Sequence, residues 1–292
     1  MEAPRLFRAP RRALRGALAA ILACALGSGT IALADTRAAG AQPLPDAQAL
    51  VIRDIPYGER DGVTLRLDVY RMGDAEKDPV LVLVHGGSWR RRSKDIWSSL
   101  GPRYAEAGYV VLAIEYRLAP PGGRTRFPAP VDDVSMAVEW AREHADVYGG
   151  DPDRVGVAGS SAGAHLALLA AGTQSRPEAI ALFSAPVRLQ GLHRADILRG
   201  SIENFMGCPP EECPAEYRQA SGVRSVDERT PPMFVAFSSE ELIPRHQPME
   251  LVRRLVDAGR PFVRLELPGD RHGMRVANGA FDETVSFLEL YL

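Results

Sequence analysis

The sequence of 292 residues is poor in cysteine, contains no internal repeat and has no basic stripe in its main part. Three cysteines are too few for a disulfide-rich scaffold, and a content of 46% hydrophobic and 25% charged residues excludes a disordered or collagen-like chain. Residues 35–292 carry a net charge of −6, which disfavours nucleic-acid binding. We find no Gly-rich phosphate loop and no convincing metal-ligand cluster, so neither a cofactor nor a metal is predicted.

The basic residues that the main part lacks are concentrated at the N-terminus, where residues 1–34 carry a net charge of +4. Five arginines precede a charge-free run, Gly16–Ala34, that ends in Ala-Leu-Ala. This pattern predicts a secretory signal peptide over residues 1–34, with Ala41 as an alternative end, followed by a linker over residues 35–49. An uncleaved anchor is the alternative because the run approaches membrane-spanning length, but Ala and Gly give it a weak insertion energy. A lipoprotein signal at Cys24 is a poor match. We therefore expect export to the periplasm or the exterior, with no stable membrane span after signal removal.

Export would leave two of the three cysteines, Cys208 and Cys213, in a Pro-rich loop. In an oxidising compartment two nearby cysteines favour a small disulfide. Two free thiols or half a metal site are the alternatives, although no histidine is close enough in sequence to complete a zinc site.

Short apolar runs alternate with helical patterns along the rest of the chain. Val63–Tyr70 alternates with period two behind an Arg-Asp-Gly turn, which predicts an antiparallel hairpin with Val51–Tyr57. Val80–Val84 is apolar at every position, as a strand buried on both faces of a parallel sheet requires. The pattern predicts a mostly parallel, doubly wound α/β sheet. The further predicted strands are Tyr109–Ile114, Arg154–Ala158, Ile180–Phe183, Met233–Phe237 and Phe262–Leu267.

One catalytic domain over residues 50–292 accommodates these elements. The longest stretch without a clear strand, residues 185–232, is interpreted as a small cap or insertion within this domain, placed to cover an active site. The sequence does not predict the oligomeric state.

The segment Gly-Ser-Ser-Ala-Gly at residues 159–163 directly follows an apolar strand and precedes an Ala/Leu-rich helical run. In this context G-x-S-x-G predicts a nucleophile elbow, a tight strand-to-helix turn that lifts Ser161 clear of the sheet. The preceding segment His85-Gly86-Gly87-Ser88-Trp89 follows another buried strand. Its glycine amides, with the amide of Ala162, are predicted to form an oxyanion hole.

Among six histidines, His272 follows the last predicted strand, where the sheet delivers loops to the same edge as the elbow. We predict it to be the general base. His165 is expected to pack in the core or to make a local hydrogen bond, and His85 to brace the glycine loop. The acid is expected after the strand Met233–Phe237, where Glu240 and Glu241 compete.

These motifs together resemble the α/β-hydrolase esterase family, over about residues 50–292. The matching segments are HGGSW, EYRLAP, FPAPVDD, GGDPDRVGVAGSSAG, the acid followed by LIP, and HGM. The chain is similar to the branch with carboxylesterases, feruloyl and acetyl esterases and kynurenine formamidases, and is related to hormone-sensitive-lipase-like enzymes.

The resemblance implies that Ser161 is the nucleophile, His272 the base, and Gly86, Gly87 and Ala162 the oxyanion donors. The family's acid is usually an Asp four residues before a Pro. Counting back from Pro244 gives Glu240, so the resemblance favours Glu240 and leaves Glu241 as the alternative. The HGGxW variant implies an open site, for which Ser88, Trp89 and Ser160 are candidate pocket residues, with a buried core position as the alternative for Trp89.

The leading functional hypothesis is a secreted serine carboxylesterase that forms an acyl-enzyme on small-molecule or polymer-attached esters. An amidase or arylformamidase is the enzymatic alternative. A non-catalytic binding protein of the same fold is the third, because function resides in sites rather than folds.

Overall fold

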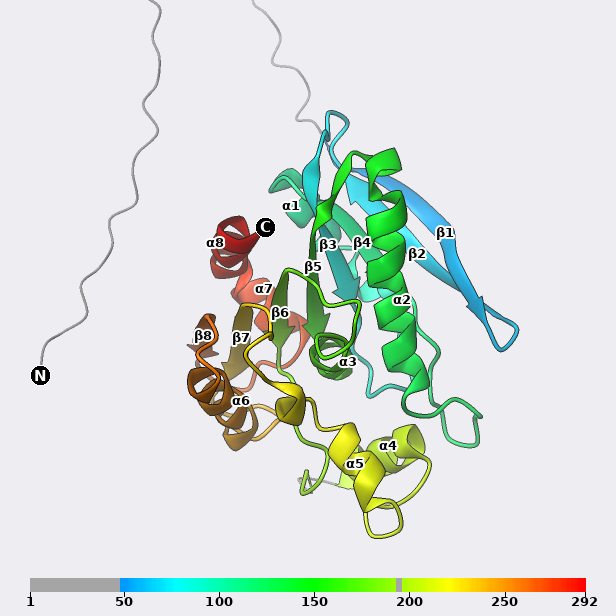
Figure 1. The fold of residues 1–292 in the computed structure, drawn as a ribbon, viewed down its shortest axis with the longest axis vertical. Helices are drawn as coiled ribbons and strands as arrows, with labels where there is room; N and C mark the ends of the chain where they lie inside the picture. Colours follow the sequence, from blue (N-terminus) through cyan, green and yellow to red (C-terminus); the bar gives the residue numbers. More distant parts are fainter. Residues whose placement is uncertain (1–47, 193–195) are drawn as a thin grey trace, which may run out of the picture. The chain divides into compact units, whose positions relative to one another are not determined.

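The computed structural model describes residues 48–192 and 196–292 (Figure 1). The predicted signal peptide over residues 1–34 and nearly all of the predicted linker lie outside the described residues. Within the described part of the chain, no helix is both long enough and apolar enough to cross a membrane.

An eight-stranded sheet forms the centre of the fold, with the strand order β1-β2-β4-β3-β5-β6-β7-β8. The pairs β1–β2 and β2–β4 are antiparallel, and every other neighbouring pair is parallel. This confirms the predicted doubly wound sheet with an N-terminal antiparallel hairpin. The strands are β1 Leu50–Arg60, β2 Val63–Arg71, β3 Asp78–Val84, β4 Val110–Ile114, β5 Gly150–Ser160, β6 Ala179–Phe183, β7 Met233–Ser238 and β8 Phe262–Leu267.

Burial along the strands follows their place in the sheet. Strand β3 lies between β4 and β5, and its apolar residues Val80–Val84 are fully buried. Edge strand β1 is largely exposed, as its mixed composition predicts. The turn between β1 and β2 places Asp61 and Gly62 at φ 51° and 74°, a conformation that suits a tight hairpin and favours glycine.

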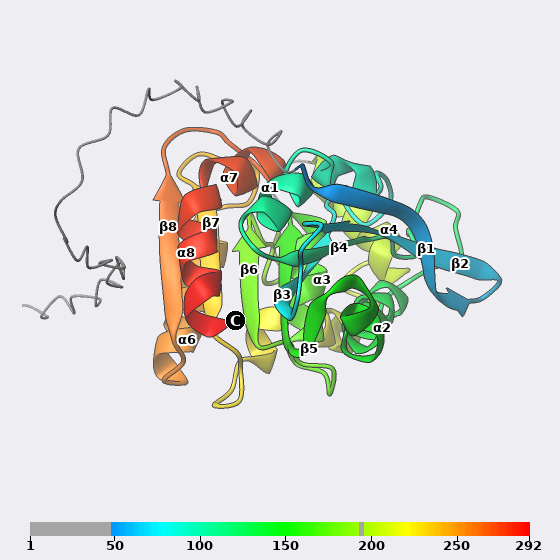
Figure 2. The same cartoon turned by 90° about the horizontal axis from the view of Figure 1, so that it is seen from above.

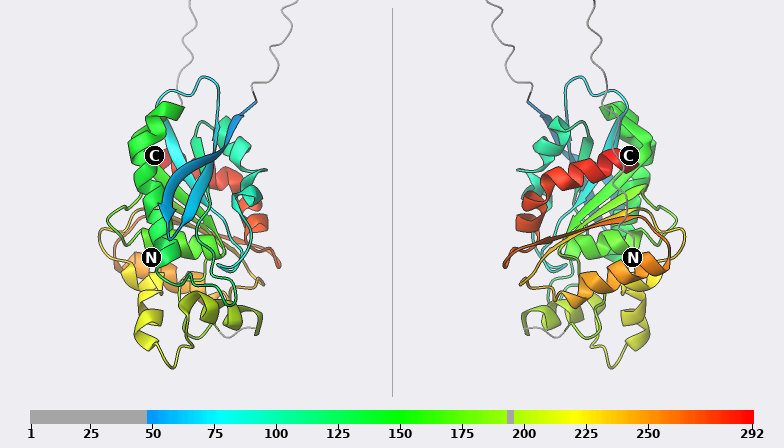
Figure 3. Two further views of the ribbon diagram at one scale, coloured as in Figure 1. Left: turned by 90° about the vertical axis from the view of Figure 1, so that its right-hand side faces the viewer. Right: turned by 90° about the vertical axis from the view of Figure 1, so that its left-hand side faces the viewer.

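Helices cover both faces of the sheet (Figures 2 and 3). Helices α2, α3 and α6 pack on one face, and α1, α7 and α8 pack on the other, so two apolar cores lie on either side of the strands. The helices are α1 Gly101–Glu106, α2 Ala129–His144, α3 Ala162–Ala170, α4 Asp196–Met206, α5 Pro214–Gln219, α6 His246–Asp257, α7 Met274–Gly279 and α8 Phe281–Tyr291, with short 3₁₀ helices η1 Lys94–Trp97, η2 Ala145–Tyr148 and η3 Gly222–Ser225.

The described residues of the stretch 185–232 include α4, α5 and η3, and α4 and α5 lie side by side beyond one end of the sheet (Figure 1). The ring of Phe205 stacks on Trp89 at 5.0 Å between ring centres, so this segment is anchored to the loop after β3. Cys208 and Cys213 are placed as a bonded pair with their Cα atoms 6.3 Å apart. The roles of the segment as a cap and of the pair as a disulfide stay predictions.

Candidate active site

Ser161 stands at the turn between β5 and α3. Its φ of 53° and ψ of −118° form a strained backbone conformation that is rare for a residue with a side chain. Two glycines make the turn sterically feasible. A Cβ atom at Gly159 would lie 2.5 Å from the carbonyl oxygen of Gly163, and one at Gly163 would lie 2.2 Å from that of Val84. The elbow therefore requires glycine on both sides of the serine. The start of α3 packs closely against the end of β3.

His272 joins Ser161 to a carboxylate. Its Nε2 atom is 2.9 Å from Ser161 Oγ, and its Nδ1 atom is 2.6 Å from Glu241 Oε2. These partners favour the tautomer in which Nδ1–H donates to the carboxylate and Nε2 accepts from the hydroxyl. The His272 side chain is 26% exposed, whereas that of Glu241 is fully buried.

The carboxylate against His272 belongs to Glu241, so the preference for Glu240 is wrong. Glu240 is exposed, and its backbone amide donates to the carbonyl of Gly269 at 3.0 Å. This contact closes the turn after β7 in such a way that the next residue, Glu241, points inward. The second Glu241 oxygen accepts the Ser238 amide at 2.9 Å, which fixes the carboxylate in place.

Sequence reasoning missed one residue that positions the histidine loop. Ser184, at the end of β6, is fully buried, and its hydroxyl accepts the amide of Gly273 at 2.9 Å. Gly273 is itself confined, because a Cβ atom there would lie 2.9 Å from Ser160 Oγ. A serine after a buried strand carries no distinctive local signal, so only the folded arrangement identifies it.

The predicted oxyanion loop lies directly against the elbow. A Cβ atom at Gly86 would lie 2.7 Å from the carbonyl oxygen of Ser160, and one at Gly87, with φ 128°, would lie 1.9 Å from that of Arg91. Ala162 is the first residue of α3, where the leading amides have no partner within the helix. The three predicted donors are thus gathered around Ser161, and their role in binding an oxyanion stays a prediction.

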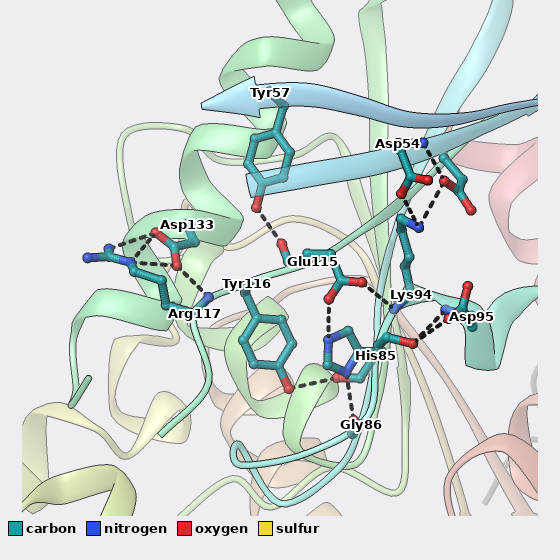
Figure 4. A network of polar contacts seen from close by, with 12 residues as sticks. Asp54, Tyr57, His85, Gly86, Lys94, Asp95, Glu115, Tyr116, Arg117 and Asp133 are labelled. Atoms are coloured by element: carbon teal, nitrogen blue, oxygen red, sulfur yellow. Dashed lines mark hydrogen bonds and ion pairs between the residues drawn. The ribbon is translucent and has the colours of Figure 1, made fainter. Parts of the chain in front are cut away.

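His85 braces this loop from inside the protein (Figure 4). It is fully buried. Its Nδ1 lies 2.7 Å from the Gly86 carbonyl oxygen, and its Nε2 lies 3.7 Å from a Glu115 oxygen. Tyr116 stacks on the imidazole at 4.3 Å and donates its hydroxyl to the His85 carbonyl at 3.1 Å. Burial raises the pKa of Tyr116, so its hydroxyl remains a donor.

The same network reaches the N-terminal hairpin (Figure 4). The Lys94 amide donates to Glu115 at 3.4 Å, and the Lys94 ammonium is 3.0 Å from both Asp54 and the fully buried Asp68. Nearby, Arg117 pairs with the fully buried Asp133 of α2, with Nη2 at 2.7 Å from Oδ1. These contacts connect the hairpin and α2 to the segments that flank the glycine loop.

Trp89 and His165 belong to the core. Trp89 is 1% exposed and donates its indole N–H to His165 Nδ1 at 3.2 Å, while His165 Nε2 lies 2.7 Å from the Ala220 carbonyl oxygen. Burial lowers the pKa of His165 to about 4, so the imidazole is neutral. The prediction that His165 packs in the core is confirmed, and Trp89 is not a pocket residue.

A cavity of about 330 Å³ opens in front of Ser161. Ser88 and Ser160 line it, as predicted, together with His272 and both glycines of the oxyanion loop. Three arginines complete the polar lining, and the described lining includes no Asp or Glu. The remaining lining residues are Arg91, Arg92, Ile96, Leu242, Gly273, Met274 and Arg275. In the described part of the chain no group of three or more His, Cys, Asp or Glu is arranged to hold a metal ion.

Comparison with known families identifies the fold and the family. The family model described as BD-FAE matches residues 67–255. The chain belongs to the BD-FAE family. This confirms its resemblance to α/β-hydrolase esterases, and the match includes the oxyanion loop, the elbow and the predicted acid.

Curated relatives of this BD-FAE chain include two proteins of Mycobacterium tuberculosis. Esterase LipC is 34% identical over 250 residues, covering 78% of this chain and 61% of LipC. Esterase LipQ is 32% identical over 245 residues, covering 77% of this chain and 57% of LipQ. The chain thus spans about 60% of the length of these relatives.

Solved structures confirm the α/β-hydrolase fold. A truncated carbohydrate esterase from gut microbiota superposes with a TM-score of 0.72 at 20% identity, covering 85% of this BD-FAE chain and 98% of the other. Esterase 2 of Thermogutta terrifontis gives 0.67 at 23% identity, covering 84% and 93%.

Proposed function

We propose that this protein is a serine carboxylesterase whose nucleophile, base and acid are Ser161, His272 and Glu241. The observation that carries the proposal is the unbroken chain of contacts from Glu241 through His272 to Ser161, which lines the cavity, with links of 2.6 and 2.9 Å. Membership of the BD-FAE family and the esterase names of the relatives LipC and LipQ support the same activity.

In the proposed reaction, Ser161 Oγ attacks the ester carbonyl while His272 Nε2 takes its proton. The carboxylate of Glu241 holds Nδ1–H and stabilises the imidazolium that forms. The imidazolium then gives its proton to the departing alcohol, leaving an acyl group on Ser161. Water attacks this acyl-enzyme with His272 as base and releases the acid.

Negative charge on the tetrahedral intermediates would be met by backbone amides of Gly86, Gly87 and Ala162. The network around His85 supports this role, because it fixes the loop before any charge develops. Loss of one such donor typically lowers the rate about 10²–10³-fold, so a rigid loop matters as much as the side chains.

Replacement of the nucleophile tests the proposal. Ser161→Ala should abolish hydrolysis of a short-chain aryl ester such as para-nitrophenyl butyrate and labelling by a fluorophosphonate probe. Ser99→Ala, which changes an exposed serine outside the cavity, should retain both. Full hydrolysis by Ser161→Ala would overturn the mechanism, and absence of labelling in the folded parent would favour a binding protein.

The proposal includes export. The charge pattern of residues 1–34 supports a cleaved signal, and the 6.3 Å Cα separation of Cys208 and Cys213 is in the range for a disulfide. N-terminal sequencing of the protein from the producing cells tests cleavage after residue 34 or 41. An uncleaved N-terminus would contradict it.

A further inference from the structure

The lining of the active-site cavity has a strong excess of positive charge. Arg91, Arg92 and Arg275 line it, and no carboxylate belongs to the described lining. The surrounding protein is acidic, with a net charge of −6 over residues 35–292. A cavity lined by one sign of charge concentrates ligands of the opposite sign.

Two of these guanidinium groups have no competing protein partner. Within residues 48–192 and 196–292, the exposed side chains of Arg91 and Arg92 make no hydrogen bond or ion pair. Arg275 is less available, because it donates to the Asp270 carbonyl at 3.0 Å and lies 3.7 Å from its carboxylate. Arg91 and Arg92 are therefore the stronger candidates for binding an anion.

The loop that carries these two arginines is fixed at its base. Trp89 is buried, and its carbonyl accepts the Ala119 amide at 2.8 Å. The Gly87 carbonyl accepts the Arg90 amide at 3.2 Å, and the absent Cβ of Gly87 makes room for the Arg91 carbonyl. The backbone that carries the two arginines is therefore anchored. It is continuous with the predicted oxyanion hole, because Arg91 is only four residues after Gly87.

We infer that the site prefers esters that carry an oxyanion, such as a carboxylate or a phosphate, within reach of the scissile bond. This inference rests on the proposed esterase function and adds its substrate class. A planar guanidinium matches the geometry of carboxylate and phosphate oxygens, and two side chains on one loop offer several donors. Arg91 and Arg92 are specificity-determining residues in this assignment, and Arg275 adds to the local field.

Matched pairs of esters test the inference and locate the anion. In the first pair, para-carboxyphenyl butyrate carries the charge on the alcohol and para-carbamoylphenyl butyrate is its neutral counterpart. In the second pair, para-nitrophenyl hemiadipate carries the charge on the acyl group and para-nitrophenyl hexanoate is its neutral counterpart. Para-phosphonophenyl butyrate distinguishes a phosphate-like anion from a carboxylate. The measured quantity is the ratio of kcat/KM between the charged and the neutral member, which cancels differences in the active fraction of enzyme.

We expect a ratio of about tenfold at low salt in at least one pair, since each partly exposed ion pair is worth a few-fold in binding. Arg91→Gln and Arg92→Gln should each lower the ratio about threefold. The double charge reversal R91E/R92E should invert the preference. Raising salt from about 0.01 M to about 1 M shortens the screening length from about 30 Å to about 3 Å, and should lower the ratio in the parent.

Arg253→Gln is the matched control, because Arg253 is exposed on α6 and outside the cavity. It should leave the ratio and its salt dependence unchanged. Hydrolysis of the neutral esters with a salt-independent ratio of one or less in all pairs would overturn the inference and leave the esterase proposal intact. Failure to hydrolyse any of the esters would overturn both.

Discussion

Two histidines lie near the elbow serine, and their surroundings prepare them for opposite tasks. His165 is four residues beyond Ser161, on α3, and is fully buried between the Trp89 indole and the Ala220 carbonyl. His272 is more than a hundred residues away in sequence, yet reaches Ser161 Oγ at the open cavity. Nearness in sequence to the nucleophile therefore says little about which imidazole is suited to proton transfer.

Hydrogen-bond partners explain the difference. His165 receives an N–H on Nδ1 and faces a carbonyl with Nε2, so only its neutral form satisfies both contacts. His272 faces a carboxylate with Nδ1 and a hydroxyl oxygen with Nε2, and both groups are able to accept from an imidazolium. One site fixes a single protonation state, whereas the other accommodates two.

The largest expected effect separates these two histidines directly. His272→Ala should lower kcat/KM for an aryl ester by at least about 10⁴-fold, because the proposed base is lost. His165→Ala should lower the free energy of unfolding by about 2–4 kcal/mol, since it leaves two buried polar groups unpaired.

Urea denaturation measures the stability, and kcat/KM normalised to the concentration of folded protein measures the activity. The normalised rate of His165→Ala should stay within about tenfold of the parent. An equal loss of normalised activity in the two variants would contradict the separation.

The second prediction compares the two adjacent carboxylates. Glu241→Gln replaces the acceptor of the His272 Nδ1–H with an amide and should lower kcat by about 10²–10⁴-fold through the wrong tautomer. Glu240→Gln is the matched control with the same chemical change on an exposed side chain, and its rate should stay within about twofold of the parent.

Initial rates of the two variants are measured across a pH series. Thermal unfolding of both variants is compared as well, so that loss of the catalytic carboxylate is distinguished from loss of the folded structure. The assignment of Glu241 would fail if Glu240→Gln were the slower enzyme.

Much of the fold was predictable because hydrophobic periodicity records burial directly. Runs such as Val80–Val84 have no polar position, and only a strand covered on both faces buries every side chain. The elbow was predictable for a steric reason, since the glycines around Ser161 occupy positions where a Cβ would collide with backbone.

The sequence was least informative where the path of the backbone, rather than the residue type, decides which side chain points into the protein. Glu240 and Glu241 are identical residues at adjacent positions, and only the closure of the turn by Gly269 selects which one enters the core. The buried network at Lys94 and Asp68 was equally hidden, because charged residues in a sequence are expected to be solvated. The sequence left Trp89 open between the pocket and the core, and its ring packs inward against Phe205.

The third and smallest predicted effect is the pH dependence of stability that His165 causes, and it tests the comparison of the two histidines. Burial lowers the pKa of His165 to about 4, below the value of about 6.5 expected in an unfolded chain. Between these values the unfolded state binds the extra proton, so the contribution of neutral His165 to stability is complete above about pH 6.5 and declines as the pH falls toward 4.

The loss is about 3 kcal/mol over this window, because each tenfold difference in proton affinity between the folded and unfolded states corresponds to about 1.4 kcal/mol. The free energy of unfolding in urea, measured at pH 7.5 and at pH 4, should therefore fall about 3 kcal/mol more in the parent than in His165→Gln. Glutamine is the appropriate reference because it offers an acceptor to Trp89 and a donor to Ala220 without titrating. Equal pH dependence in the two proteins would mean that His165 takes up a proton in the folded state as readily as in the unfolded state, and the contrast with His272 would then rest on exposure alone.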